Sequence, residues 1–163
     1  MADAPSLHAS AVLVGNFAVL IRGTAGAGKS RLALALIGAA ETGLLRFARL
    51  VGDDRVHLQA CNGRLMVQPA PHLSGLIEVR GIGIRRLNYE PIAVVGLVVD
   101  LAAKDAVRLP CSTRTAIAGI GLPRLAIVAG SDPLLSVLAF LTTAPGDIKP
   151  QPSPLRLATR EQS

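Results

Sequence analysis

The sequence predicts an α/β domain with a mixed sheet and flanking helices. An apolar, β-branched run over Ala11–Ile21 leads into Gly23–Ser30, which reads GTAGAGKS and fits the pattern G-x-x-x-x-G-K-[ST]. A Leu- and Ala-rich segment without proline, Lys29–Ala40, follows directly and predicts a helix. Two later apolar runs flank Asn62-Gly63, a strong signal for an antiparallel hairpin. The strand, glycine loop and helix together predict the phosphate-loop (Walker A) nucleotide-binding class, and the hairpin indicates that its sheet is mixed.

The first predicted elements position the glycine loop. Ala11–Ile21 is interrupted at Gly15-Asn16, so it predicts two short strands joined by a tight turn, the second running into the loop. The helix over Lys29–Ala40 is apolar on nearly all sides, which predicts that it is buried. Leu44–Val51 then predicts a strand that ends at Gly52-Asp53-Asp54.

The middle of the chain predicts more antiparallel structure. Val56–Ala60 and Arg64–Gln68 are the two strands of the Asn62-Gly63 hairpin, after which Pro69 and Pro71 break the pattern. Leu76–Leu87, LIEVRGIGIRRL, is a strand-like run with Gly81 and Gly83 on either side of Ile82. A β-bulge is the structural explanation of these glycines.

The last predicted elements complete the sheet and add a helix. Ile92–Asp100 is apolar and predicts a central strand, and Arg124–Val128 predicts a shorter one. Asp132–Thr143 predicts a helix with Ser131 as its cap. We therefore expect one catalytic domain over residues 1–144 and a proline-rich, flexible tail over residues 145–163.

Composition limits the partners. The net charge is +6, but the basic residues are scattered and only Phe17, Phe47, Tyr89 and Phe140 are aromatic, so we expect no nucleic-acid partner. Arginine, the prevalent cation, suits anionic ligands and an acidic or phosphorylated partner. No apolar run reaches the roughly 18 residues of a membrane span, and the N-terminus lacks the layout of a secretory signal. We expect a cytoplasmic protein that does not bind membranes.

The glycine loop has a chemical explanation. Its glycines allow backbone N–H groups to turn onto phosphate oxygens, at the positive N-terminal end of the following helix. Lys29 is expected to reach the β- and γ-phosphates, and the Ser30 hydroxyl to bind Mg²⁺. The residues expected to hold the nucleotide are Gly23, Thr24, Ala25, Gly26, Ala27, Gly28, Lys29 and Ser30.

The acidic pair after the predicted strand is ambiguous on its own. Asp53 and Asp54 stand where acids beside a bound phosphate hold Mg²⁺ or handle a proton. Gly-Asp-Asp is also good turn composition. The residues alone leave both interpretations open, with Asp53 as a candidate metal ligand.

Four blocks in order resemble the catalytic domain of the HPr kinase/phosphorylase family, bacterial enzymes that act on a serine of the phosphocarrier protein HPr. They are Leu7-His8 followed by Ala11–Val14, the Gly23–Ser30 loop, Val51–Arg55, and Leu76–Ile84 in the form LIEVRGIGI. A fainter match is Val107–Leu109 before Leu122–Leu125. The resemblance spans about Leu7 to Phe140 and is to the short form that lacks a separate N-terminal domain.

The resemblance implies roles for individual residues. Lys29 and the loop amides would hold the donor phosphates, Ser30 and Glu78 would bind Mg²⁺, and Asp54 would carry the proton. His8 and Arg108 are the remaining active-site positions. Without the resemblance, His8 would be interpreted as an ordinary surface histidine and Arg108 as a solvated charge.

The implied activity is an ATP- and Mg²⁺-dependent serine kinase acting on HPr, with pyrophosphate as an alternative donor. The implied fold is similar to phosphoenolpyruvate carboxykinase, and the family is typically hexameric. Phosphorolysis of the phosphoserine stays open, because the family's arginine-containing loop for that reaction corresponds here to Ala129–Pro133, which has none.

Two alternatives remain. A small-molecule phosphate-loop kinase would need a lid, and no segment obviously supplies an arginine-rich one. A nucleotide-sensing module without turnover would need neither the base Asp54 nor the metal ligand Glu78.

Overall fold

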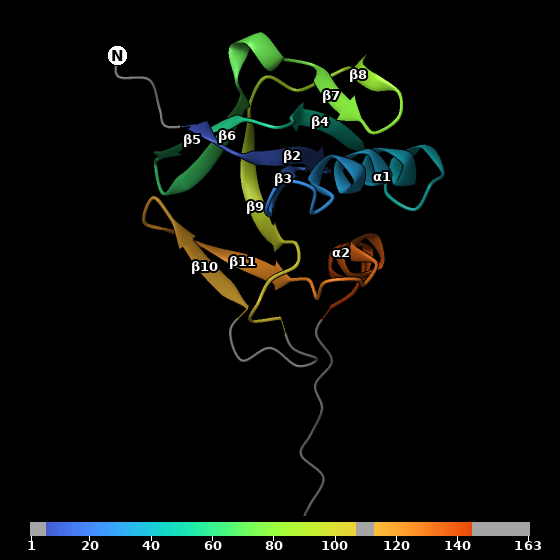
Figure 1. The fold of residues 1–163 in the computed structure, drawn as a ribbon. Coiled ribbons are helices and arrows are strands. Elements are labelled where there is room, and N and C mark those ends of the chain that lie inside the picture. Colours follow the sequence, from blue (N-terminus) through green and yellow to red (C-terminus); the bar gives the residue numbers. More distant parts are fainter. Residues whose placement is uncertain (1–5, 107–112, 145–163) are drawn as a thin grey trace, which may run out of the picture.

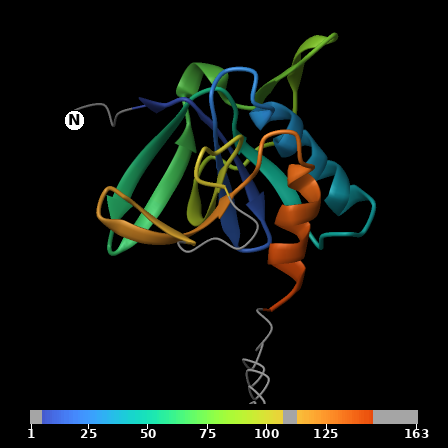
Figure 2. The same cartoon turned by 60° about the horizontal axis from the view of Figure 1, so that its bottom comes forward.

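A nine-stranded, curled mixed sheet dominates the computed structural model, which describes residues 6–106 and 113–144. Both α-helices pack on the same side of this sheet, and a separate two-stranded hairpin stands beside the first of them (Figures 1 and 2). The predicted α/β class, with a mixed sheet and flanking helices, is confirmed.

The strands are divided between the large sheet and the hairpin. Those of the large sheet are β1 (Ser6–Leu7), β2 (Ala9–Val14), β3 (Phe17–Arg22), β4 (Ala48–Gly52), β5 (Val56–Cys61), β6 (Arg64–Pro69), β9 (Ala93–Asp100), β10 (Arg114–Ile117) and β11 (Ile120–Ala126). The separate hairpin is β7 (Leu76–Val79) with β8 (Gly83–Arg86), and the helices are α1 (Lys29–Glu41), the 3₁₀ turn η1 (Pro71–Leu73) and α2 (Pro133–Thr142).

Strand β9 is central, as predicted for the apolar run that forms it. The order is β1-β5-β6-β9-β3-β2-β4, with β11 joined to β9 and β10 to β11. β9 runs parallel to β3 and β11 but antiparallel to β6, which pairs with its first residues. The carboxyl ends of β3, β9 and β11 therefore meet at one edge of the sheet, where ligands bind in open α/β sheets.

Alternating residues of the central strands build two apolar cores. Val19 and Ile21 of β3 face the helices together with Val99 of β9, whereas Leu20 and Val98 face the opposite core. Phe17 lies directly over Gly96, where an added Cβ would be 2.5 Å from the Phe17 Cγ. Gly96 is thus required by close packing within the sheet.

Helix α1 and strand β4 differ in part from the predictions. The helix buries one face, including Leu32 and Leu36, but leaves Leu34 37% exposed, so it is not buried on all sides. The predicted strand over Leu44–Val51 begins only at Ala48. Its first residues instead terminate α1: the amide N–H groups of both Leu44 and Leu45 donate to the Ala39 carbonyl, since left-handed glycine turns the chain back at Gly43.

The segment over Leu76–Leu87 is a hairpin rather than one bulged strand. Gly81 and Gly83 have φ values of 87° and 88°, in the left-handed region that glycine favours, and they reverse the chain between β7 and β8. The glycines of the LIEVRGIGI string therefore form a turn.

The C-terminal part contains a hairpin that the sequence did not predict. Strand β11 starts at Ile120, earlier than the predicted Arg124, and pairs with β10 through a turn at Ala118-Gly119. Helix α2 is capped by Asp132, whose carboxylate accepts from the Leu134 amide, and not by the predicted Ser131. The Ser131 hydroxyl donates to the Val128 carbonyl at 2.7 Å.

The predicted tail over residues 145–163 and Arg108 lie outside the described residues. The domain boundary at residue 144 stays a prediction. Within the described ranges, no helix is long and apolar enough to cross a membrane.

Candidate functional site

The glycine loop connects the end of β3 to the start of α1, as its sequence context predicts. Gly26 and Gly28 adopt left-handed backbone conformations, with φ of 81° and 102°. Gly28 precedes the first residue of α1, and neither a side-chain cap nor an acidic residue occupies the first turn. The N–H groups of that turn are therefore available to an anion.

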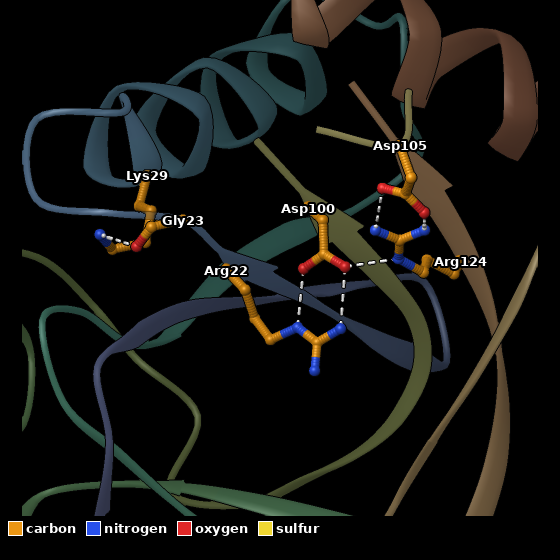
Figure 3. A network of polar contacts seen from close by, with 6 residues as sticks. All are labelled: Arg22, Gly23, Lys29, Asp100, Asp105 and Arg124. Carbon is orange, nitrogen blue, oxygen red and sulfur yellow. Dashed lines mark hydrogen bonds and ion pairs between the residues drawn. The ribbon is translucent and has the colours of Figure 1, made fainter. Parts of the chain in front are cut away.

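Lys29 is held at the loop by backbone carbonyls. Its side chain is 7% exposed and donates through Nζ to the carbonyl oxygens of Gly23 and Thr24 at 2.9 and 3.1 Å; Figure 3 shows the contact with Gly23. No carboxylate pairs with Lys29 within residues 6–106 and 113–144. Its positive charge is therefore left to attract an anion beside the loop.

Asp53 is the polar centre of the site. It is 3% exposed and accepts from Ser10 Oγ at 2.5 Å and from Ser30 Oγ at 2.8 Å to both carboxylate oxygens. The amide of Glu78 lies 3.3 Å from its Oδ2. All three donors are neutral, and no cation of the described segments forms an ion pair with this buried carboxylate.

The fold explains how these residues meet. Ser10 lies two residues before Val12 on β2, so it shares the helix-facing side of the sheet. Ala11 pairs with Gly52, which brings Ser10 beside Asp53 at the end of β4. Ser30, in the first turn of α1, approaches from above the same face.

Asp54 and His8 form a second contact next to this cluster. His8 Nε2 lies 2.8 Å from Asp54 Oδ1, and both side chains are about half exposed, at 46% and 61%. Leu7 of β1 pairs with Val56 of β5, which places the residues on either side of that pairing close together. Asp54 has φ of 65°, a conformation that aspartate and asparagine tolerate better than most residues.

The donor set at Asp53 fits a magnesium ion. Ser30 supplies a hydroxyl and Asp53 a carboxylate, the hard oxygen ligands that Mg²⁺ prefers. The side chain of Glu78 is exposed, while its backbone amide contacts Asp53. The described residues contain no group of three His, Cys, Asp or Glu side chains arranged to hold a metal. Mg²⁺ in phosphate-transfer sites needs only one or two carboxylates, because waters and substrate phosphates complete its shell.

An ion-pair network lies at the carboxyl ends of β3, β9 and β11, beside the base of the loop (Figure 3). We define it as Arg22, Asp100, Asp105 and Arg124. Asp100 accepts from Arg22 Nε at 2.7 Å and from Arg124 Nε at 2.5 Å, and Arg124 also makes a bidentate pair with Asp105 at 2.7 and 2.9 Å.

The network stabilises the charged forms of Asp100, Asp105 and Arg124. Burial opposes ionisation of Asp100, but the hydrogen bonds from Arg22 and Arg124 outweigh it and lower the pKa of Asp100. The hydrogen bond from Arg124 lowers the pKa of Asp105, and the bonds to Asp105 and Asp100 raise the pKa of Arg124. The Arg22 carbonyl also accepts from the Leu101 amide at 2.9 Å, so this network fixes the residue directly before the loop.

The structure brings most of the predicted site residues to one place. Lys29 and Ser30 end the loop, and Asp53 contacts both Ser30 and the Glu78 amide. The His8–Asp54 pair includes the residue that directly follows Asp53 in the chain. Sequence reasoning missed Ser10 and the whole ion-pair network. A serine within an otherwise apolar strand was the available signal for Ser10, and charged residues near the ends of predicted strands were the signal for the network.

Comparisons with known proteins agree on one family. Residues 1–90 match the family model for the HPr serine kinase C-terminal domain. The HPr kinase/phosphorylases of Limosilactobacillus reuteri and Clostridium tetani are 41% and 39% identical to this chain over 85 and 84 residues, 52% of the chain in each case. These matches span only 24% and 25% of the two relatives.

A solved structure extends the likeness. The HPr(Ser) kinase/phosphatase of Coxiella burnetii superimposes with a TM-score of 0.69 and 26% identity, over 84% of this chain and 93% of that one. The structural match thus reaches beyond the residues that the family model covers. On this sequence and structural evidence, the chain belongs to the HPr serine kinase C-terminal domain family.

Proposed function

We propose that this chain is a cytoplasmic, ATP- and Mg²⁺-dependent kinase that phosphorylates a serine of HPr. The proposal rests on the hydrogen bond from Ser30 Oγ to the carboxylate of the buried Asp53, at 2.8 Å. This bond lies at the base of the loop whose carbonyl oxygens hold Lys29 Nζ. The phosphate-binding loop, the Lys29 ammonium group and a set of oxygen ligands for a metal ion would therefore be adjacent, as phosphoryl transfer requires. The names of the relatives, kinase/phosphorylase and kinase/phosphatase, agree with this chemistry.

The donor side of the site would position and neutralise the nucleotide. The uncapped N–H groups of the loop and the first turn of α1 would bind phosphate oxygens, and Lys29 would turn from its two carbonyl partners to the β- and γ-phosphates. Ser30, Asp53 and Glu78 would hold the metal. Bound Mg²⁺ would supply neutralisation of the charge that develops on the phosphate oxygens.

The acceptor side would use Asp54 as the general base. The seryl oxygen attacks the γ-phosphorus, the bond to the bridging oxygen breaks, and ADP leaves while Asp54 takes the seryl proton. His8, 2.8 Å from Asp54 Oδ1, orients this carboxylate. Both side chains are exposed enough to meet a protein substrate, and Asp54 directly follows the proposed metal ligand Asp53.

The relatives' names also suggest the reverse reaction, but the corresponding loop offers no arginine. Residues 129–133 read AGSDP, and Ser131 turns its hydroxyl back to Val128. We therefore propose the kinase as the main activity. Phosphorolysis is tested separately, by incubating the protein with serine-phosphorylated HPr and inorganic phosphate and measuring the loss of the phosphoserine.

The decisive experiment is phosphoryl transfer with a panel of purified acceptors. The protein is incubated with ATP or pyrophosphate, with and without Mg²⁺, and with HPr, unrelated serine proteins and small hydroxyl metabolites. We expect transfer to HPr that requires Mg²⁺ and is abolished in Lys29→Ala. Transfer to a metabolite instead would establish a small-molecule kinase, and nucleotide binding without any transfer would establish a sensing module.

A metal titration tests the ligand set in the same assay. Glu78→Gln is isosteric and loses only an anionic oxygen, so it should raise the Mg²⁺ concentration needed for half-maximal activity. An unchanged titration would leave Glu78 with its backbone role alone. Gel filtration coupled to light scattering tests the hexamer that the family suggests.

A further inference from the structure

The β7–β8 hairpin leaves the body of the domain beside the candidate site (Figures 1 and 2). Its base is anchored, because Ile77 is 1% exposed in the helix-side core and the Glu78 amide contacts the Asp53 carboxylate at 3.3 Å. Its outer part is exposed to solvent: Ile82 is 66% and Ile84 is 68% exposed. Two isoleucines this close together in solvent are unusual for an isolated domain surface, since large aliphatic side chains are normally buried.

The strand register places the exposed isoleucine on the same face as the proposed metal ligand. Glu78 pairs with Ile84, and Leu76 pairs with Arg86 two residues further on. Directly opposite residues of an antiparallel pair share a face, with Cβ atoms roughly 5 Å apart. Ile84 therefore adjoins Glu78 on the outer face, whereas Ile77 and its partner Arg85 lie on the other face.

The charge around the isoleucines is positive on balance, because the arginines of the hairpin outnumber its one exposed carboxylate, Glu78. Arg80, Arg85 and Arg86 are exposed, and none of them forms an ion pair with any carboxylate that the structure describes. Arg86 also borders a surface hollow together with Arg49 and Tyr89. An apolar centre flanked by Arg80 and Arg86 complements an apolar surface that carries carboxylates.

We infer that the outer part of the β7–β8 hairpin, made by Ile82, Ile84, Arg80 and Arg86, is the docking surface for the protein acceptor. The occupant is a folded protein whose phosphorylatable serine lies beside an apolar patch flanked by acidic residues. The inference rests on the proposed function. A serine near Asp54 would place its flanking surface on the hairpin, because Glu78 connects the two: its amide contacts Asp53, and its cross-strand neighbour is Ile84.

The test separates docking from chemistry by steady-state kinetics with HPr as the probe. Ile82→Ser and Ile84→Ser should each raise the KM for HPr about tenfold, while kcat and the KM for ATP stay within about twofold of the wild type. Arg80→Glu and Arg86→Glu should raise the same KM and reduce its dependence on salt. Because these side chains are exposed, the midpoint of thermal unfolding should not change.

Matched controls lie on other parts of the surface. Leu135→Ser on α2 removes an equally exposed aliphatic side chain, 69% exposed, on an element well apart from the hairpin. Arg64→Glu reverses an exposed charge at the start of β6. Both should leave the KM for HPr unchanged.

The outcomes distinguish a failure of the docking surface from a failure of the proposed kinase activity. Wild-type transfer to HPr with an unchanged KM in the hairpin variants would overturn the docking surface and leave the proposed function standing. Absence of transfer by the wild type would overturn both. A smaller assembly in the isoleucine variants, measured by light scattering, would show that a second copy of the chain covers this face and would also overturn the inference.

Discussion

Replacing Asp53 should separate the stability of the site from its chemistry. In Asp53→Ala, Ser10 Oγ, which is fully buried, loses its acceptor, and Ser30 Oγ and the Glu78 amide lose theirs. A buried donor left unpaired costs about 1–3 kcal/mol, and the two less buried donors cost about 1 kcal/mol each. The expected loss is about 3–5 kcal/mol in the free energy of unfolding, or roughly 10 °C in Tm for a domain of this size.

Asp53→Asn should cost much less. With its oxygen in the place of Oδ2, asparagine can still accept from Ser30 and from the Glu78 amide, and its NH₂ group can donate to the Ser10 hydroxyl oxygen, so only the Ser10 hydroxyl hydrogen loses its acceptor. The charge assistance of the hydrogen bonds is lost, about 1–2 kcal/mol, and the cost of keeping an unpaired carboxylate out of water is removed with it. Both variants nevertheless remove the anionic ligand. They should therefore raise the Mg²⁺ requirement of the kinase alike, with excess Mg²⁺ restoring part of the Asp53→Asn activity.

The assays are urea unfolding of both variants and the rate of HPr phosphorylation across a Mg²⁺ series. Ser10→Ala combined with Asp53→Ala completes a double-mutant cycle. Adding Ser10→Ala to Asp53→Ala should cost little stability, because it removes the hydroxyl that Asp53→Ala leaves unpaired. Equal destabilisation by Asn and Ala would refute the hydrogen-bond argument. An unchanged Mg²⁺ requirement in both would refute the metal assignment.

Three further perturbations test other parts of the structure. Asp54→Asn should keep the fold, because asparagine tolerates the left-handed φ of 65°, yet lower the kinase rate about 10²–10⁴-fold at unchanged ATP affinity; a full-speed variant would contradict its role as base. The lowered pKa of Asp100 contributes stability that is complete above its unfolded value, about 3.9, and is lost as pH falls through the folded pKa. Urea unfolding between pH 5 and pH 2 should therefore show a shallower acid loss in Asp100→Asn than in the wild type, and identical profiles would contradict the network's contribution. Gly96→Ala forces a methyl group to 2.5 Å from Phe17 and should destabilise by about 1–3 kcal/mol. The control Gly38→Ala, in open space on α1, should instead stabilise by up to about 1 kcal/mol, and a loss there as large as at Gly96 would argue against the packing explanation.

The parts of the fold that depend on local pattern were predictable from the sequence. Apolar runs, Asn62-Gly63 and the glycine loop are short-range signals, and they located β2, β3, α1, the β5–β6 hairpin and β9. The β10–β11 hairpin was missed because its turn, Ala118-Gly119, requires a left-handed alanine, φ 50°, that no propensity favours. The start of β4 was misplaced because Leu44 and Leu45 have strand-like composition but wrap back onto the end of α1.

The site was predictable only where single residues carry a chemical motif. Lys29 and Ser30 follow from the loop pattern, and the family string drew attention to Glu78. Ser10 was not predictable, because its role arises from the long-range pairing of Ala11 with Gly52. The ion-pair network likewise depends on three strands ending at one edge of the sheet, which only the topology reveals.

The balance of charge at the site has a consequence for what can enter it. The two arginines of the ion-pair network are matched by its two aspartates, so the network anchors the loop without adding attraction for phosphate. Lys29 brings one positive charge to the loop and the buried Asp53, in contact with Ser30, one negative charge, so the charges of these two side chains cancel. A triphosphate without a metal ion would be repelled by the Asp53 carboxylate. A nucleotide that already carries Mg²⁺ would offer phosphate oxygens to Lys29 and the metal ion to Asp53. Under the proposed function, we therefore expect the site to admit the metal-bound nucleotide, rather than the nucleotide and the metal in succession.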